Sequence, residues 1–589
     1  MSVIATRLAL LSMLGLSFQP AGALAQSSAP PEQAPPAAES TAPPASASAE
    51  QSQPATQTLP SAAAVPLAPQ VKGQRPRVNP KLVAPAATQL APAVENLPAP
   101  DSLALPTNPA QVQIRELRPL SLAQVENLAE VNNPNLKAIA SQVDQAQSNL
   151  RAQIAQWYPT INLRGDSFPT YTDSETRNRI RSAPPPTEAD PQPAKRTTTE
   201  VLKGDRWAAA LAISAQWSLI NPQRNPSIAA ARDQFERAKY QYVIALRDLR
   251  LQAAQAYFEL QRADDQVRIG QESVRASLVS LRDAKARFQA GVATKLEVLE
   301  ADTQLARDQQ LLTNSIAAQA VARRSLAALL DLPQSVTPTA QDPSRVLGVW
   351  QPSLQESIVA AYAFREELDQ VLLDISIANS QANASLAQVQ PFLNIVAGLD
   401  AGWYDGNQPS LGRRDLLSGA SYDASIGLNF SWNVFDGGAA AAQARQSRQL
   451  AQENSFRFAQ RRDGIRLEVE ESFYELEKNN RNITTTALEV ISSRESLRLA
   501  RLRFQAGVTT QREVVDNQRD LTNAEVRYST AITDYNRRLA ELRRRTGLDQ
   551  IVSCPPLSMT GVKPVGASDV PVEPARLLPA CRAGTPGAV

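Results

Sequence analysis

Four carboxylates follow two copies of one hexapeptide at matching positions. The letters RFQAGV begin at Arg287 and again at Arg503. The acidic residues that come after them are Glu297 and Glu300 in the first copy, and Glu513 and Asp516 in the second. Carboxylates at a fixed spacing can attract cations or accept hydrogen bonds from a helix N-terminus. In a closed ring of several chains they would form acidic rings at its mouth.

Each hexapeptide ends one helix and precedes another. Gly291 and Gly507 can adopt the left-handed conformation that closes a helix C-terminus at no steric cost. The T-x-x-E spacing of a capping box then follows, at Thr294 to Glu297 and at Thr510 to Glu513. In such a box the Thr oxygen accepts from the N3 amide and the Glu reaches back to the N-cap amide. The motif predicts the tip of a helical hairpin.

Two interpretations of these carboxylates stay open. Glu297 and Glu513 can be helix caps or functional groups. Glu300 and Asp516 lie one turn further on, outside the cap, and can form the acidic ring or belong to a solvated helix face.

Composition argues against an enzyme. The 589 residues include no histidine, which removes the commonest general base and metal ligand, and no dinucleotide, P-loop, GxSxG or CxxC motif occurs. We therefore predict no catalytic residue, metal site or cofactor. The 60 basic and 58 acidic residues leave a net charge of +2 without long blocks of one sign, so no nucleic-acid partner is expected.

Residues 1–25 have the pattern of a secretory signal peptide. Arg7 precedes an apolar run over residues 8–16, and Ala23, Leu24 and Ala25 form a small-residue cleavage site. The residue directly after that site is Gln26 and not a cysteine, which argues against a lipid anchor. No later stretch approaches 18 consecutive apolar residues, so a membrane-spanning part would have to be a β-barrel.

The two ends of the chain lack periodic apolar content. Residues 26–114 are rich in Pro and Ala and predict a disordered linker. Residues 551–589 form a Pro-rich tail with the only cysteines, Cys554 and Cys581. In an oxidising compartment these can pair, and two free thiols are the alternative.

Between these ends the chain duplicates itself. We predict one unit over residues 115–345 and a second over residues 346–550, since YFEL at residues 257–260 recurs as FYEL at residues 473–476. Seven-residue apolar series predict closely packed, supercoiled helices. Their expected ranges are 226–290 and 438–506, with half-length partners at 120–156 and 294–330. At about 1.5 Å per residue the long helices imply a rod or tube of about 100 Å.

Alternating segments lie between the helices of each unit. Residues 207–219 and 422–434 each carry two amphipathic aromatics ten residues apart on an apolar face: Trp207 and Trp217, Tyr422 and Trp432. A tilted membrane strand needs about 9 to 11 residues between interfacial aromatics, so we favour lipid-facing strands over a half-buried soluble sheet. Weaker partner strands are expected at 159–167 and 392–401, with polar loops at 171–205 and 404–421. Four strands cannot close a barrel, so several chains must contribute.

Over residues 115–550 the chain resembles the TolC-type outer membrane efflux proteins. The resemblance rests on the opening SLAQVENLAEVNNPNLKAIASQVDQAQSNLRAQIAQWYPTI, on WSLINP and WNVFDGG after the second strand of each pair, and on the two RFQAGV tips with TKLEVLEA and TQREVVDN. It implies a mainly α protein with membrane β-structure. Three chains would form a twelve-stranded β-barrel in the outer membrane and a coiled-coil helical tunnel in the periplasm.

The resemblance also implies partners and sites. The tips would dock a periplasmic adaptor (membrane fusion) protein, which couples the channel to an inner-membrane efflux pump or ABC transporter. The tip residues are Gly291, Val292, Ala293, Thr294, Gly507, Val508, Thr509 and Thr510. Glu513 and Asp516 match an acidic constriction of the family that cations can block. Where the best-known member of the family has an Arg and a Tyr that help hold the entrance shut, the matching residues of this chain are Thr509 and Phe504. The closing network can therefore differ, or Arg512 can substitute.

The expected function is a passive channel, gated at the hairpin tips, for efflux or type I secretion. The alternative is a periplasmic coiled-coil adaptor or scaffold protein, which also has long hairpins but lacks strands bounded by aromatics.

Overall fold

The computed structural model describes residues 86–182, 196–410, 413–548 and 551–553, all within one compact unit, Ala62–Val589. The predicted signal peptide, most of the predicted linker, and Cys554 and Cys581 lie outside the described residues.

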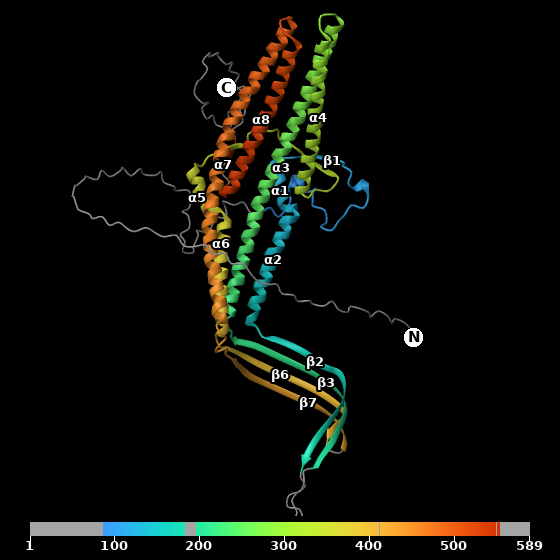
Figure 1. Ribbon diagram of the computed structural model, residues 1–589, viewed down its shortest axis with the longest axis vertical. Coiled ribbons are helices and arrows are strands. Elements are labelled where there is room, and N and C mark those ends of the chain that lie inside the picture. Colours follow the sequence, from blue (N-terminus) through green and yellow to red (C-terminus); the bar gives the residue numbers. More distant parts are fainter. Residues whose placement is uncertain (1–85, 183–195, 411–412, 549–550, 554–589) are drawn as a thin grey trace, which may run out of the picture. The chain divides into compact units, whose positions relative to one another are not determined.

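Two long helices run through this unit, with α6 Glu366–Leu386 and α8 Gln511–Thr546 between them (Figure 1). Helix α3 spans Arg224–Gln289 with 66 residues and α7 spans Ala439–Gln505 with 67 residues. At about 1.5 Å per residue each is about 100 Å long, which confirms both predictions. The other shorter helices are α1 Leu122–Asn132, α2 Pro134–Ile154, α4 Lys295–Leu329 and α5 Leu354–Phe364.

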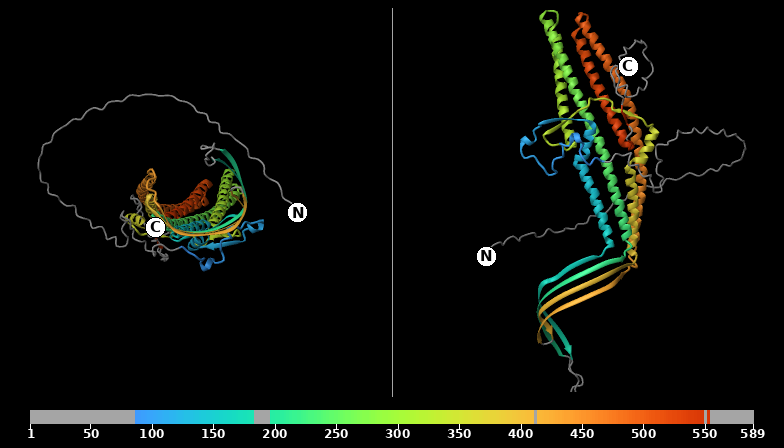
Figure 2. Two further views of the ribbon diagram at one scale, coloured as in Figure 1. Left: turned by 90° about the horizontal axis from the view of Figure 1, so that it is seen from below. Right: turned by 180° about the vertical axis from the view of Figure 1, so that it is seen from behind.

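The shorter helices pair with the long ones as the duplication predicts. Helices α2 and α4 pack against α3, while α6 and α8 pack against α7. The seven-residue series forms the contacts: Leu246, Ala253 and Leu260 are buried in α3, and Val469, Leu476 and Ile483 are buried in α7. Because α3 also contacts α6 and α8, the two copies share one helical layer, which is curved when viewed along its length (Figure 2).

The helix predicted over residues 120–156 is wrong as a single element. It divides into α1 and α2 at Asn133, whose φ of −55° and ψ of 121° are non-helical. Pro134 causes the break, because proline disfavours helical geometry in the residue before it and begins a new helix well. The second copy has the same break at Arg365, between α5 and α6, without a proline.

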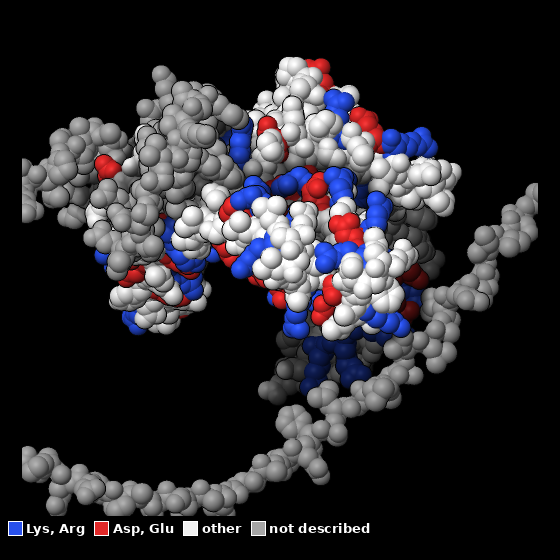
Figure 3. Space-filling view, turned by 90° about the horizontal axis from the view of Figure 1, so that it is seen from above, with Lys and Arg blue, Asp and Glu red and all other residues white. Residues whose placement is uncertain are grey.

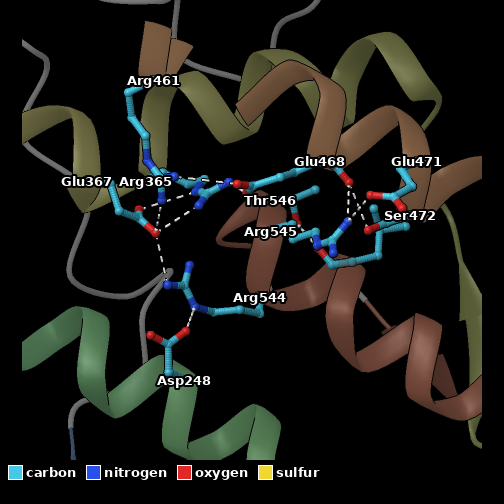
Figure 4. A network of polar contacts seen from close by, with 11 residues as sticks. Asp248, Arg365, Glu367, Arg461, Glu468, Glu471, Ser472, Arg544, Arg545 and Thr546 are labelled. Atoms are coloured by element: carbon cyan, nitrogen blue, oxygen red, sulfur yellow. Dashed lines mark hydrogen bonds and ion pairs between the residues drawn. The ribbon is translucent and has the colours of Figure 1, made fainter. Parts of the chain in front are cut away.

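A buried charged network surrounds this second break (Figure 4). The Glu367 carboxylate binds Arg365 Nη2 at 2.8 Å and Arg544 Nη2 at 2.9 Å. Arg544 also reaches Asp248 on α3 at 2.6 Å, and Arg365 reaches Glu468 on α7 at 2.5 Å. The network therefore ties α3, α6, α7 and α8 together.

A four-stranded antiparallel sheet continues from the ends of α2, α3, α6 and α7 (Figure 1). Its strands, in spatial order, are β2 Thr160–Ser182, β3 Arg196–Ile220, β6 Phe392–Ser410 and β7 Arg413–Ser431. All four predicted strands lie here, although β7 ends before residues 432–434. The polar loops predicted at 171–205 and 404–421 are wrong over most of their length, because the strands continue through them as hairpins. Polar residues can continue a ladder since the hydrogen bonds come from the backbone.

Small elements complete the middle of the unit. Strand β1 Glu116–Leu120 pairs in parallel with β4 Val336–Ala340, and β5 Gly348–Trp350 pairs with β8 Ile551–Ser553. Short 3-10 turns lie at Pro92–Val94, Pro109–Gln111, Ala155–Trp157 and Ala387–Val389.

Residues 86–97, placed in the linker by the sequence analysis, pack against α1. The Val94 and Leu97 side chains are buried there. The Ala91 amide also donates to Asn127 Oδ1 at 2.8 Å. Among the described residues, no helix is sufficiently long and apolar to cross a membrane.

Candidate functional site

Both RFQAGV motifs close their helices as predicted. Gly291 and Gly507 have φ values of +75° and +73°. The Val292 amide donates to the Arg287 carbonyl at 3.0 Å, and the Val508 amide donates to the Arg503 carbonyl at 2.9 Å. This six-residue bond around a left-handed glycine is a Schellman motif. The two tips therefore share one backbone design, and Figure 3 shows acidic and basic side chains interspersed on this end.

The first tip has the predicted capping box. The Glu297 amide donates to Thr294 Oγ1 at 3.4 Å, and the Thr294 amide donates to Glu297 Oε1 at 3.2 Å. The capping interpretation of Glu297 is thus confirmed. Glu300 is half-buried and makes no hydrogen bond or ion pair with the described residues.

The capping box predicted at the second tip is wrong. The Thr510 side chain accepts no cap hydrogen bond. Glu513 instead pairs with Arg503 Nη1 at 3.2 Å and accepts a hydrogen bond from the Thr509 hydroxyl. The first copy has Ala293 at the position of Thr509, so no hydroxyl competes there for the glutamate.

Asp516 is also paired on the second hairpin. Its carboxylate lies 3.8 Å from Arg512 Nε and 3.4 Å from Arg519 Nη2. Its side chain remains 43% exposed, and that of Glu513 remains 36% exposed. The structure therefore places Glu513 and Asp516 together on α8, each next to arginine, whereas Glu300 on α4 lacks such a neighbour.

Contacts between the two hairpins involve Phe504, which the sequence analysis named, and residues that it gave no role. The Arg287 guanidinium lies over the Phe504 ring, 4.3 Å from its centroid. Gln511, which is buried, donates to Ser280 Oγ of α3. These contacts border an open cleft of about 670 Å³ between the hairpins. No local sequence pattern indicates these contacts, because their partners lie more than 200 residues apart.

The four-stranded sheet has one apolar and one polar face. The register pairs Ile213 with Leu163 and Leu399, so these alternate positions share a face. On the opposite face lie Asn162, Ser214, Gln216, Asn394, Asp400, Asp423 and Asn429. The apolar side chains are exposed, with Leu163 at 67% and Ile426 at 81%. A soluble monomer would not leave so wide an apolar face uncovered.

An aromatic belt crosses this apolar face. Trp207 pairs with Tyr171 on β2, and their rings are 5.2 Å apart. Trp207 also pairs with Asp405, so Trp403 on β6 lies two residues closer to the helices, and Tyr422 pairs with Ala401, two residues closer again. Because strands of a barrel are tilted, residues at one height shift in register from each strand to the next, as these aromatics do. The sequence analysis included Trp207 and Tyr422 but missed Tyr171 and Trp403.

The other two predicted aromatics lie where the helices meet the sheet. Trp217 Nε1 donates to the Trp157 carbonyl at 3.0 Å, and Trp432 Nε1 donates to the Val389 carbonyl at 3.0 Å. Both acceptors end the short 3-10 turn before the first strand of their copy. Both rings remain about half exposed, as interfacial tryptophans commonly are.

This combination defines a class of protein. Duplicated helical hairpins that continue into a sheet with an aromatic-bordered apolar face are the architecture of outer membrane channel proteins. The chain belongs to the outer membrane efflux protein family, whose model matches residues 125–331 and 358–548. It is an outer membrane protein of that family's helical-tunnel and β-barrel fold class.

Individual relatives agree with this assignment. The outer membrane protein TolC of Vibrio cholerae is 25% identical over 445 residues, which cover 72% of this chain and 90% of TolC. The fold matches VceC of Vibrio cholerae with a TM-score of 0.56 and 17% identity, over 72% of this chain and 96% of VceC. It also matches the open-state MtrE channel of Neisseria gonorrhoeae with a TM-score of 0.56 and 14% identity, over 82% of this chain and 98% of MtrE.

Proposed function

We propose that three copies of this chain form a passive, gated exit channel for efflux or type I secretion. The supporting observation is the two-faced sheet. Each chain supplies four strands with an apolar face bordered by aromatics, and β2 and β7 each have one edge that pairs with no strand among the described residues. Twelve strands from three chains would pair these edges and close one barrel. The apolar face would then contact outer membrane lipids.

The helices would continue the barrel as a periplasmic tunnel. Since α3 and α7 are each about 100 Å long, the hairpin tips would lie far from the membrane. There the eight tip residues, Gly291 to Thr294 and Gly507 to Thr510, would dock a periplasmic adaptor protein. The adaptor would connect the channel to an inner-membrane efflux pump or ABC transporter that supplies the energy.

The tip carboxylates would form the constriction. In a trimer, Glu513 and Asp516 would each occur three times around the entrance, and Glu297 and Glu300 would occur on the neighbouring hairpins. Opening would move the α7–α8 hairpin relative to α3. That movement must break the Arg287–Phe504 contact and the hydrogen bond from Gln511 to Ser280.

Single-channel current across a planar bilayer tests this function. The purified, detergent-extracted oligomer should give discrete and long-lived conductance steps. A properly assembled oligomer that gives no steps, even after Glu513 and Asp516 are replaced by alanine, would overturn the proposal.

A further inference from the structure

The β2–β3 hairpin continues well past the aromatic belt. Beyond Tyr171 and Trp207, the register pairs Glu175 with Lys203 and then runs on without a bulge to Ser182 and Arg196. Alternate residues of a strand share one face. Three arginines therefore lie on the same face as the belt: Arg177, Arg179 and Arg181.

Beyond the Asp173–Asp205 pair, which lies on the same face next to the belt, this face carries four cations and one carboxylate, Glu175. All three arginines and Lys203 are exposed. Arg177 Nη2 and Lys203 Nζ both bind one carboxylate, Glu175, at 2.7 Å and 3.1 Å. Arg179 and Arg181 make no ion pair with the described residues. The outer part of the hairpin thus presents a cationic ladder, defined here as Arg177, Arg179, Arg181 and Lys203.

The ladder lies beyond the hydrocarbon zone. At about 3.3 Å per residue, Lys203 is about 13 Å past Trp207 along the strand, and Arg181 is about 33 Å past Tyr171. With a strand tilt of about 40°, these lengths correspond to about 10 Å and 25 Å above the belt. Lipid headgroups and their attached sugars occupy this zone in the outer leaflet.

We propose that the cationic ladder binds the phosphate groups of lipids in the outer leaflet. A guanidinium binds phosphate through two parallel hydrogen bonds, and alternate residues about 7 Å apart can each contact a different phosphate. Thr199 and Thr197, paired with Arg179 and Arg181, add hydroxyl donors on the same face. The ladder would hold the hairpin against the membrane surface.

The position of the ladder favours a lipid phosphate over a soluble anion as its ligand. It is continuous with the apolar, lipid-facing side of the sheet, whereas a phosphate on its way through the channel would meet the polar side. On that opposite side of the same hairpin lies Arg206, which pairs with Thr172. The inference rests on the proposed function, because both require the apolar face to contact lipid.

The test measures retention of phosphorylated lipid A on the full-length, detergent-purified protein by native mass spectrometry. The main variant replaces Arg177, Arg179 and Arg181 with glutamine. A second triple variant with lysine keeps the charge. A matched pair, Arg179→Gln and Arg206→Gln, removes one positive charge from either face and serves if the triple variant fails to assemble. Parallel samples receive dephosphorylated lipid A, or inorganic phosphate at constant ionic strength.

The triple glutamine variant should lose lipid A affinity by about tenfold or more, since each cation near a charged lipid surface contributes about fivefold. The lysine variant should lose less, and Arg206→Gln should match the wild type. Equal retention by the wild type and the glutamine variants, or equal binding of dephosphorylated lipid A, overturns the proposal. Complete displacement by inorganic phosphate overturns the lipid assignment. Bilayer currents from the same samples separate this failure from failure of the channel function.

Discussion

The Arg287 guanidinium of α3 lies 4.3 Å from the ring centroid of Phe504 on α7, and its Nη1 donates to the Phe504 carbonyl at 3.4 Å. Arg287 thus contacts the last turn of α7 in two ways: its guanidinium lies over the ring, and one of its N–H groups donates to the backbone. Since the first copy of RFQAGV supplies the arginine and the second supplies the phenylalanine, the repeated motif binds itself. The two copies contribute different residues of the same hexapeptide to this contact.

Arg287→Ala should favour opening of the entrance. A cation–π contact and one hydrogen bond together contribute about 1 to 2 kcal/mol, so their loss should shift the hairpin equilibrium about tenfold. Single-channel recording should show a higher open probability. Arg275→Ala is the control, because among the described residues Arg275 pairs with Glu272 of its own helix alone, at 3.2 Å. Equal open probabilities for both variants would contradict a locking role for Arg287.

Replacing Glu513 and Asp516 together with alanine should raise conductance and weaken block by multivalent cations. In the proposed trimer the change removes six negative charges from the proposed constriction. The control removes the same charge elsewhere, with Glu495→Ala and Asp463→Ala on the exposed side of α7, where each pairs with a nearby arginine. Unchanged block in the tip variant means that the constriction lies elsewhere.

Thr509→Ala should convert the second tip into a copy of the first. Without the hydroxyl, Glu513 can accept from the Thr510 amide as Glu297 does from Thr294. One capping bond contributes about 1 kcal/mol, so hydrogen exchange at the Thr510 amide should slow about fivefold. The reciprocal variant, Ala293→Thr, should speed exchange at Thr294. Exchange that changes in neither variant would show that the neighbouring hydroxyl does not select the cap.

Glu367→Gln should destabilise the protein far more than a surface substitution. Glu367 is buried with Arg365 and Arg544, and removing one partner of a buried pair commonly costs about 3 to 5 kcal/mol. Glu477→Gln provides the control, since Glu477 pairs with Arg481 on an exposed helix face and should contribute at most about 1 kcal/mol. Thermal unfolding of the oligomer in detergent measures both. Similar midpoints for the two variants would contradict a structural role for the network.

The same carboxylate should contribute to acid sensitivity. Burial opposes ionisation of Glu367, but the hydrogen bond from Arg365 and the charge of Arg544 outweigh it and hold the pKa of this carboxyl well below its usual range. Its stabilising contribution is therefore complete above the ordinary value of 4.5 and is lost as the pH falls from there toward the depressed pKa. Unfolding midpoints measured between pH 7 and about pH 3 should fall less steeply for Glu367→Gln than for Glu477→Gln. Parallel curves would exclude Glu367 as an acid-sensitive group.

Sequence patterns predict those parts of the fold that depend on local periodicity. Gly291 and Gly507 mark the helix ends, and Trp207 and Trp217 mark the apolar face of β3, because backbone conformation and alternation are local properties. The strand extensions were missed because their residues are mostly polar and show no apolar alternation. The break at Pro134 could have been predicted from the proline itself.

Contacts between distant segments could not be predicted in this way. Arg365 and Glu468 are 103 residues apart, and no periodicity distinguishes buried charges from exposed ones. The loss of the second capping box depends on one hydroxyl, that of Thr509, in an otherwise repeated motif. The sequence spacing of the two tips is the same, so it does not reveal the hydrogen bond from Thr509 to Glu513.

In the proposed channel, the indole hydrogen bonds of Trp217 and Trp432 would act as pivots where the helices meet the sheet. Each fixes the point where a helix end turns into the sheet, at the carbonyls of Trp157 and Val389. A helix of about 100 Å held at one end acts as a lever, so a tilt of about 3° at the pivot moves its tip by about 5 Å. In the proposed gating, large movements of the tips would therefore require only small angular changes beside the membrane, and the strands could stay in register while the far end opens.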